Sequence, residues 1–171
     1  MKNYKNIHGP FAWLADIEIN KGPYLISFVL LVLGIILVRQ PFFEITPAFT
    51  EPTAVTLHEI DGLNKLEVGA IILNVISILA LLVPMLKFFE WKYRWFIPTV
   101  VSSLIECVIS FYLINKKNEI YESTLIGLTM KYLSIDVTLT KSACILLTTF
   151  VLTLICGLKM LIDVKNNQII Y

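Results

Sequence analysis

The sequence predicts an all-α membrane protein: a bundle of four transmembrane helices with a small antiparallel β-sheet formed by its two extracytoplasmic loops. Three observations support this fold class. Apolar residues make up 57% of the 171 residues and charged residues only 16%, against about 25% charged residues in an average soluble domain. The apolar residues gather in four long runs. The two longer segments between these runs carry patterns typical of β-strands.

The composition excludes several classes of protein. A water-soluble core of this length cannot bury so many apolar side chains, which excludes a soluble domain and a disordered chain. The net charge is +1, from 14 basic and 13 acidic residues, so no strong field attracts an anionic polymer and we expect no nucleic-acid partner. We expect the whole chain, residues 1–171, to form one integral membrane domain in contact with the lipid bilayer.

Four apolar runs approach the roughly 20 residues that a helix needs to cross a bilayer. The predicted transmembrane helices cover residues 22–38, 66–86, 95–115 and 142–162. The first run is the shortest, but it contains no charge, and the Arg39 side chain can extend from its end to the interface. No small-residue cleavage site follows it, so we expect a retained helix and not a signal peptide. Pro84 and Pro98 lie near run ends, where a missing N–H group is tolerated.

The segments outside the runs predict an orientation. The turn over residues 87–94 combines basic and aromatic residues, which is typical of a headgroup layer. Residues 1–21 are expected to be cytoplasmic and to contain an interfacial helix over 11–19, with docking to a partner as the alternative. This topology places eight basic residues inside and six outside, which favours cytoplasmic termini in a multi-pass protein of the cell membrane; the inverted orientation is the alternative. The eight inside residues are Lys2, Lys5, Lys21, Lys87, Lys92, Arg94, Lys159 and Lys165.

Both expected extracytoplasmic loops, residues 40–64 and 116–141, carry strand patterns. In the first loop, residues 42–46 and 53–60 are β-prone and separated by prolines, and an Asp-Gly turn signal follows the second piece. In the second loop, residues 134–140 alternate strictly between apolar and polar residues. An isolated strand or hairpin is marginal in water. We therefore expect both loops to join in one antiparallel sheet whose apolar face covers the outer ends of the helices.

This layout of four spans, cytoplasmic ends and outer strands resembles the claudin-like architecture over residues 22–163. The first loop of claudins typically carries Trp and Gly-Leu-Trp followed by two cysteines, whereas residues 40–64 contain neither Trp nor Cys, so sealing between cells or pore formation is not implied. The chain is also similar to small bacterial four-span proteins whose first helix ends in a Pro-aromatic pair, here Pro41-Phe42, and whose loop ends in Asp-Gly, here Asp61-Gly62. Most members of that group have no assigned activity.

Glu106 is the one ionisable residue deep inside an apolar run, where a lipid-facing carboxylate is costly. At about 1.5 Å per residue, Glu106 and Asn74 lie about 17 Å and about 18 Å from the inner turn, so we predict a hydrogen bond between them. Ser103 and Ser110 complete the predicted intramembrane polar cluster, and Thr149 or Thr153 is expected nearby. A contact between helices is the favoured role. Contact with a partner subunit and ion handling are the alternatives.

No catalytic residue, cofactor or metal site is predicted. The two histidines, His8 and His58, fall on opposite sides of the bilayer in this topology, so no paired ligand set or histidine-based triad can form. The sequence contains no nucleotide-binding or hydrolase motif. His58 is expected at a solvated strand end, with transient metal contact through Glu59 and Asp61 as the alternative. The cysteines, which lie in or beside apolar runs, are expected to act as small apolar side chains; they are Cys107, Cys144 and Cys156.

These observations favour a non-enzymatic accessory or scaffolding membrane protein. It would bind another membrane protein, an envelope component or a second copy of itself through the outer sheet and the helix faces. The alternative is a small channel or transporter subunit that uses the polar residues around Glu106. A third hypothesis is an immunity or sensor protein that receives a peptide at the outer sheet.

Overall fold

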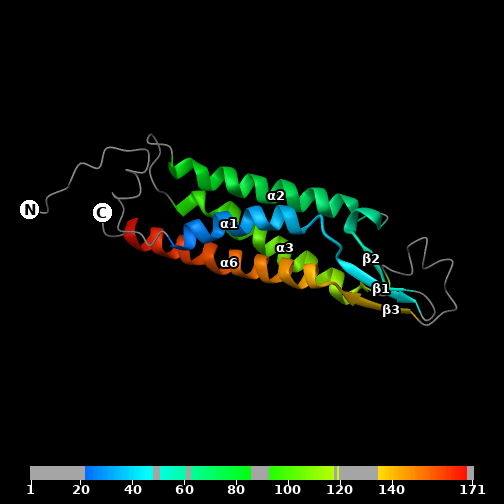
Figure 1. Ribbon diagram of the computed structural model, residues 1–171. Coiled ribbons are helices and arrows are strands. Elements are labelled where there is room, and N and C mark those ends of the chain that lie inside the picture. Colours follow the sequence, from blue (N-terminus) through cyan, green and yellow to red (C-terminus); the bar gives the residue numbers. More distant parts are fainter. Residues whose placement is uncertain are drawn as a thin grey trace, which may run out of the picture.

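The computed structural model describes residues 22–47, 51–60, 63–85, 93–117, 119 and 135–168. In this part of the chain, four long helices run side by side and a three-stranded sheet lies at one end of them (Figure 1). The helices are α1 (Gly22–Leu37), α2 (Asn64–Leu82), α3 (Ile97–Asn115) and α6 (Lys141–Gln168). Three of them, α2, α3 and α6, are long and apolar enough to cross a membrane, and α1 is a shorter apolar helix of 16 residues. The predicted mostly helical fold is therefore confirmed, with three helices that are candidates for membrane spans.

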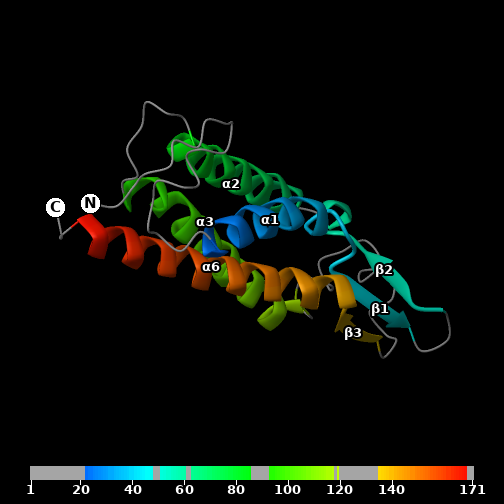
Figure 2. The same cartoon turned by 60° about the vertical axis from the view of Figure 1, so that its left-hand side comes forward.

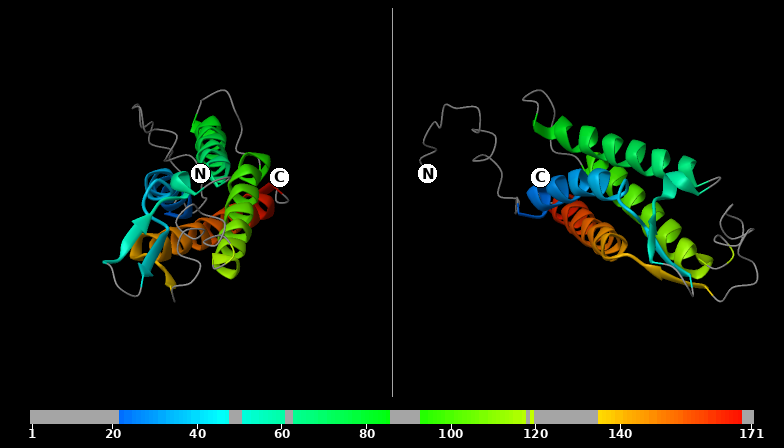
Figure 3. Two further views of the ribbon diagram at one scale, coloured as in Figure 1. Left: turned by 90° about the vertical axis from the view of Figure 1, so that its right-hand side faces the viewer. Right: turned by 45° about the vertical axis from the view of Figure 1, so that its right-hand side comes forward.

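Each helix is antiparallel to two neighbours. Helix α1 packs against α2 and α6, and α3 packs against the same two helices. Figures 2 and 3 show this arrangement of the helices from other directions. The start of α1 and the end of α6 lie at the end of the bundle opposite the sheet (Figure 1). At that end the Tyr24 hydroxyl donates a 2.7 Å hydrogen bond to the Leu81 carbonyl, which joins α1 to α2.

Prolines set two of the helix ends. Helix α2 ends at Leu82, before the predicted limit, and continues into the 3-10 turn η3 (Val83–Met85), which contains Pro84. The proline ring has no N–H group and clashes with the preceding turn, so a regular helix cannot continue through it. Pro98 lies in the first turn of α3, after the 3-10 turn η4 (Tyr93–Trp95), where its missing N–H costs nothing.

Helix α6 begins one residue before its predicted start and extends beyond the predicted limit at 162, through a polar segment that ends at Gln168. Polar residues that follow a span can continue the helix outside the apolar layer, which hydropathy alone does not reveal. The predicted interfacial helix over 11–19 lies outside the described residues, as does most of the predicted turn over 87–94.

The sheet has the order β2-β1-β3, and both of its pairings are antiparallel. Its strands are β1 (Phe43–Pro47), β2 (Thr53–Val55) and β3 (Ile135–Leu139). Phe43 pairs with Val55 on one side and with Leu139 on the other. The prediction that the segments between the helices combine into one antiparallel sheet is therefore confirmed. The central strand comes from the first segment and β3 from the second.

The predicted strand over 53–60 is wrong in its second half. The strand ends at Val55, and a 3-10 turn, η2 (Leu57–Glu59), follows it. The backbone N–H of Thr56 donates a 2.8 Å hydrogen bond to the Glu59 carboxylate. Thr56 is the N-terminal cap of this turn, and its bond to Glu59 is local. Such a bond competes with strand pairing and favours the turn.

The apolar face of the sheet packs onto the ends of the helices, as predicted. Phe43, Ile45, Val55 and Val137 are buried and belong to one cluster with residues of α3 and α6. The burial of each such side chain contributes roughly 1.5–3 kcal/mol. The sheet is thereby fixed to the bundle.

The outer surface of the helices is apolar. All the exposed large apolar side chains among the described residues lie on the four helices, with exposed fractions of up to 66% at Phe111 on α3 and 57% at Leu79 on α2. A soluble monomer rarely exposes so extensive an apolar surface. The long apolar helices together with this surface indicate contact with a lipid bilayer.

Candidate functional site

A layer of buried polar side chains crosses the middle of the bundle. Along α2, α3 and α6 these side chains lie between two apolar clusters. The sheet-end cluster contains Val38, Leu113, Leu146 and Phe150 with the buried sheet residues. The opposite cluster contains Tyr24, Leu31, Leu81, Phe96, Met160 and Val164. We name the residues between them the polar layer: Asn74, Ser77, Thr99, Ser102, Ser103, Glu106 and Thr153.

The predicted bond between Asn74 and Glu106 is confirmed. Asn74 Nδ2 donates a 2.6 Å hydrogen bond to Glu106 Oε1, and the same nitrogen lies 3.0 Å from its second acceptor, the Ala70 carbonyl. Both side chains are almost fully buried, with exposed fractions of 1% and 2%. Helical spacing predicts this contact because both residues lie at one depth on neighbouring antiparallel helices. The bond joins α2 to α3.

Helix α1 packs closely against this pair through Gly34. A Cβ atom at Gly34 would lie 3.4 Å from Asn74 Oδ1 and 3.4 Å from the Phe150 ring. The backbone of α1 therefore approaches the polar pair from one side, and the aromatic ring of α6 covers it from another.

Only one of the two oxygens of the Glu106 carboxyl has a hydrogen-bond partner. Its Oε2 atom is buried and has no hydrogen-bond partner. Among the described residues, no lysine, arginine or histidine forms an ion pair with it. Buried polar atoms in proteins nearly always form a hydrogen bond, so the lack of a partner at Oε2 needs a structural explanation.

A second bond between α2 and α3 was missed by the sequence analysis. The hydroxyl groups of Ser77 and Ser102 lie 2.7 Å apart in a buried hydrogen bond, and Ser77 also bonds to the Leu73 carbonyl at 2.9 Å. The signal was present in the spacing. Ser77 lies three residues after Asn74 and Ser102 four before Glu106, so the two serines share a depth one turn below that pair.

The other predicted cluster residues are placed differently. Ser103 is buried, but its hydroxyl donates to the Thr99 carbonyl of its own helix at 2.8 Å. Ser110 is buried one turn above Glu106, and both residues line a small cavity. Thr149 and Thr153 are buried and bond back to carbonyl groups of α6. The Asn74–Glu106 pair thus joins two helices. The hydroxyl groups of Ser103, Thr149 and Thr153 bond within their own helices.

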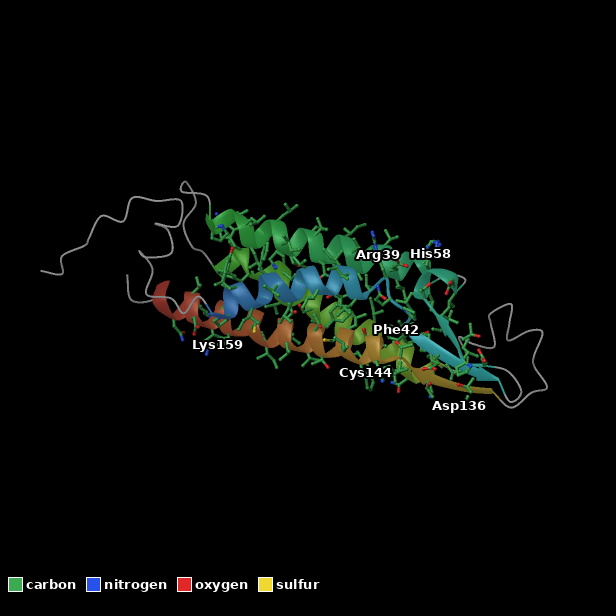
Figure 4. The ribbon with its side chains drawn as sticks, in the orientation of Figure 1. Arg39, Phe42, His58, Asp136, Cys144 and Lys159 are labelled. Carbon is green, nitrogen blue, oxygen red and sulfur yellow. The ribbon has the colours of Figure 1, made fainter. Side chains whose placement is uncertain are left out.

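Several charged side chains lie away from this layer. Figure 4 shows Arg39, His58 and Asp136 at the sheet end and Lys159 towards the other end. His58 Nδ1 lies 3.9 Å from a Glu67 carboxylate oxygen, which places the histidine beside α2. Within the described residues, no three histidine, cysteine or acidic side chains lie together in a way that could hold a metal ion. The three cysteines are free thiols.

Comparison of the chain with models of protein families, with curated proteins and with solved structures finds no match.

Proposed function

We propose that the protein is a non-enzymatic accessory or scaffolding protein of the cell membrane, which binds another membrane or envelope protein through its sheet end. One observation carries this proposal: an ordered sheet is packed onto one end of a bundle whose polar layer is closed above and below by apolar clusters. A closed polar layer suits a rigid support better than a permeation path. The sheet is then the part available for recognition.

The topology proposed with this function has four spans. Helix α1 exposes apolar side chains along its length, including Leu25, Val29 and Ile36, and it packs beside α2 and α6. Its 16 residues extend about 24 Å at about 1.5 Å per residue, somewhat less than the roughly 30 Å of the hydrocarbon core. Local thinning of the bilayer or interfacial anchoring compensates for such a mismatch. In this topology the sheet is extracytoplasmic.

The two edges of the sheet differ, which favours the β2 side for recognition. At the β3 edge, Lys117 Nζ donates a 2.6 Å hydrogen bond to the Val137 carbonyl, so part of that edge is covered. A lysine beside a strand edge also discourages pairing with another chain. On the β2 side, Thr53 and Ala54 are exposed.

Photo-cross-linking in intact cells tests the proposal. A photoreactive amino acid at Thr53 should give a discrete cross-linked protein band. The matched control is the same group at Leu79, which is 57% exposed on the lipid-facing side of α2 and should give no discrete band. Equal, diffuse labelling from both positions would contradict recognition through the sheet.

A further inference from the structure

A small cavity lies between Glu106 and the sheet end of the bundle. Its walls are apolar apart from Glu106 and Ser110. Phe42 and Leu57, from the segment that forms β1 and β2, close it on the sheet side, and Ala70 and Phe150 contribute from α2 and α6. The polar layer lies on its other side. The cavity therefore extends from the buried carboxyl towards the sheet end and not towards the opposite end.

The size and lining of the cavity restrict what it can hold. Its volume is about 20 Å³, on a scale on which one water molecule needs roughly 10–15 Å³. A hard divalent cation such as Ca²⁺ needs about six to eight oxygen ligands, and this cavity offers a single carboxyl and a single hydroxyl. A water molecule and a proton fit both the space and the chemistry.

The bonding of the carboxyl indicates where a proton would be held. Oε1 already accepts the Asn74 amide, whereas Oε2 is buried without a partner. A proton on Oε2 removes the charge from an apolar environment and converts this oxygen into a donor for a water molecule. A water molecule in the cavity would therefore supply the hydrogen-bond partner that Oε2 lacks.

Among the described residues, no titratable side chain other than Glu106 lines the cavity. Asn74 on α2 bonds to the carboxyl, Gly34 on α1 lies beside Asn74, and Phe150 on α6 lines the cavity, and none of these residues titrates. The next residue of α3, Cys107, is a half-buried free thiol. A pH response of this site would therefore come from Glu106 itself.

We propose that Glu106 is a proton-binding site, loaded from the sheet end through a water molecule in this cavity. The loss of the proton leaves a negative charge facing Phe42 and Leu57, which belong to the cluster that fixes the sheet to the bundle. Protonation of Glu106 thus favours the packed state of the sheet, and deprotonation loosens it. This proposal does not depend on the identity of any partner protein.

Modification with dicyclohexylcarbodiimide, an apolar reagent for protonated carboxylic acids, tests the site. The acid proton moves to one nitrogen of the reagent, and the carboxyl oxygen bonds to its central carbon, so one adduct forms without any co-reactant. The protein is reconstituted in lipid nanodiscs, treated over a range of pH and analysed by peptide mass spectrometry. We expect an adduct on Glu106 whose rate of formation falls as pH rises. An adduct that forms on Glu106 at a rate independent of pH would overturn the proposal.

Two matched alanine variants test the route. Ala70 lines the cavity, whereas Ala80 is a half-buried residue of the same helix outside it. Ala70→Leu fills the cavity and should slow the hydrogen–deuterium exchange of the protonated Glu106 carboxyl severalfold, as read from its infrared carbonyl band, and Ala80→Leu should leave the exchange rate unchanged. Equal exchange rates in both variants would overturn proton entry through the cavity.

Infrared spectroscopy gives a second readout that needs no reagent. At pH values well above about 4, where exposed carboxyl groups are ionised, the wild-type protein in lipid should show the carbonyl band of a protonated carboxylic acid, which disappears as pH rises further. In this range the same band should be missing from the Glu106→Gln variant. A wild-type spectrum without this band, in protein shown to be folded by circular dichroism, would overturn the proposal.

Discussion

At the sheet end, helices and strands are joined by apolar side chains that each touch several neighbours, whereas in the polar layer α2 and α3 are joined by two hydrogen bonds. Apolar packing has no preferred direction and tolerates changes of shape. A hydrogen bond fails when its atoms move apart by about 1 Å. A shift of α2 by one residue, about 1.5 Å, would break both bonds. The sheet-end cluster thus supplies stability, and the polar layer fixes the register of the two helices.

The largest effect is expected from Phe43, in the centre of the sheet-end cluster. Phe43→Ala leaves a cavity at a side chain that is 2% exposed and should lower the free energy of unfolding by about 3–5 kcal/mol. The control is Phe111→Ala, at a lipid-facing position that is 66% exposed, which should change it much less. Unfolding titrations in mixed micelles measure both. Equal losses would contradict the assignment of the cluster as the main source of stability.

A smaller effect is expected from the polar pair. Asn74→Leu leaves both Glu106 oxygens without a partner and should destabilise the bundle by about 2 kcal/mol, as for other buried polar groups that lose their bond. The double variant Asn74→Leu/Glu106→Leu removes the orphaned carboxyl together with its partner and should recover most of this loss. A double-mutant cycle in the same unfolding assay gives the coupling. A coupling of zero would show that the two side chains act independently.

The smallest effect is expected from the serine pair. Ser77→Ala removes the bond to Ser102, but hydrogen bonds between membrane helices contribute on average only about 0.6 kcal/mol. Ser102 also keeps a 3.2 Å bond to the Thr99 carbonyl, so its hydroxyl is not left without a partner. If Ser77→Ala lowered the free energy of unfolding as much as Asn74→Leu does, the Ser77–Ser102 bond would not be the weaker of the two, which would contradict this prediction.

The sequence was sufficient for the parts of the fold that depend on strong local patterns. Apolar runs located the four helices, and the strict alternation over 134–140 located β3. Equal depth along two helices was enough to pair Asn74 with Glu106. These features depend on periodicity and length, which a single sequence records.

Other features depend on contacts that no single segment records. The turn at Leu57–Glu59 is the exception, because Thr56 followed three residues later by Glu59 is a local capping pattern that the sequence does contain. The cavity beside Glu106 depends on how Phe42 and Leu57 pack over the helices. The cover of the β3 edge by Lys117 joins residues twenty positions apart in the chain. Predicting these required knowledge of the packed structure.

Cysteine accessibility in intact cells tests the central claim most directly, that one sheet from two distant segments lies outside the membrane above a four-span bundle. Thr56 follows β2, Thr138 lies within β3, and Lys165 is exposed near the opposite end of α6. Single cysteines at these positions, in a background without the three native thiols, are treated with a membrane-impermeant maleimide. We expect labelling at 56 and 138, and at 165 only after the membrane is permeabilised. Labelling of 56 and 138 from opposite sides of the membrane would contradict the claim.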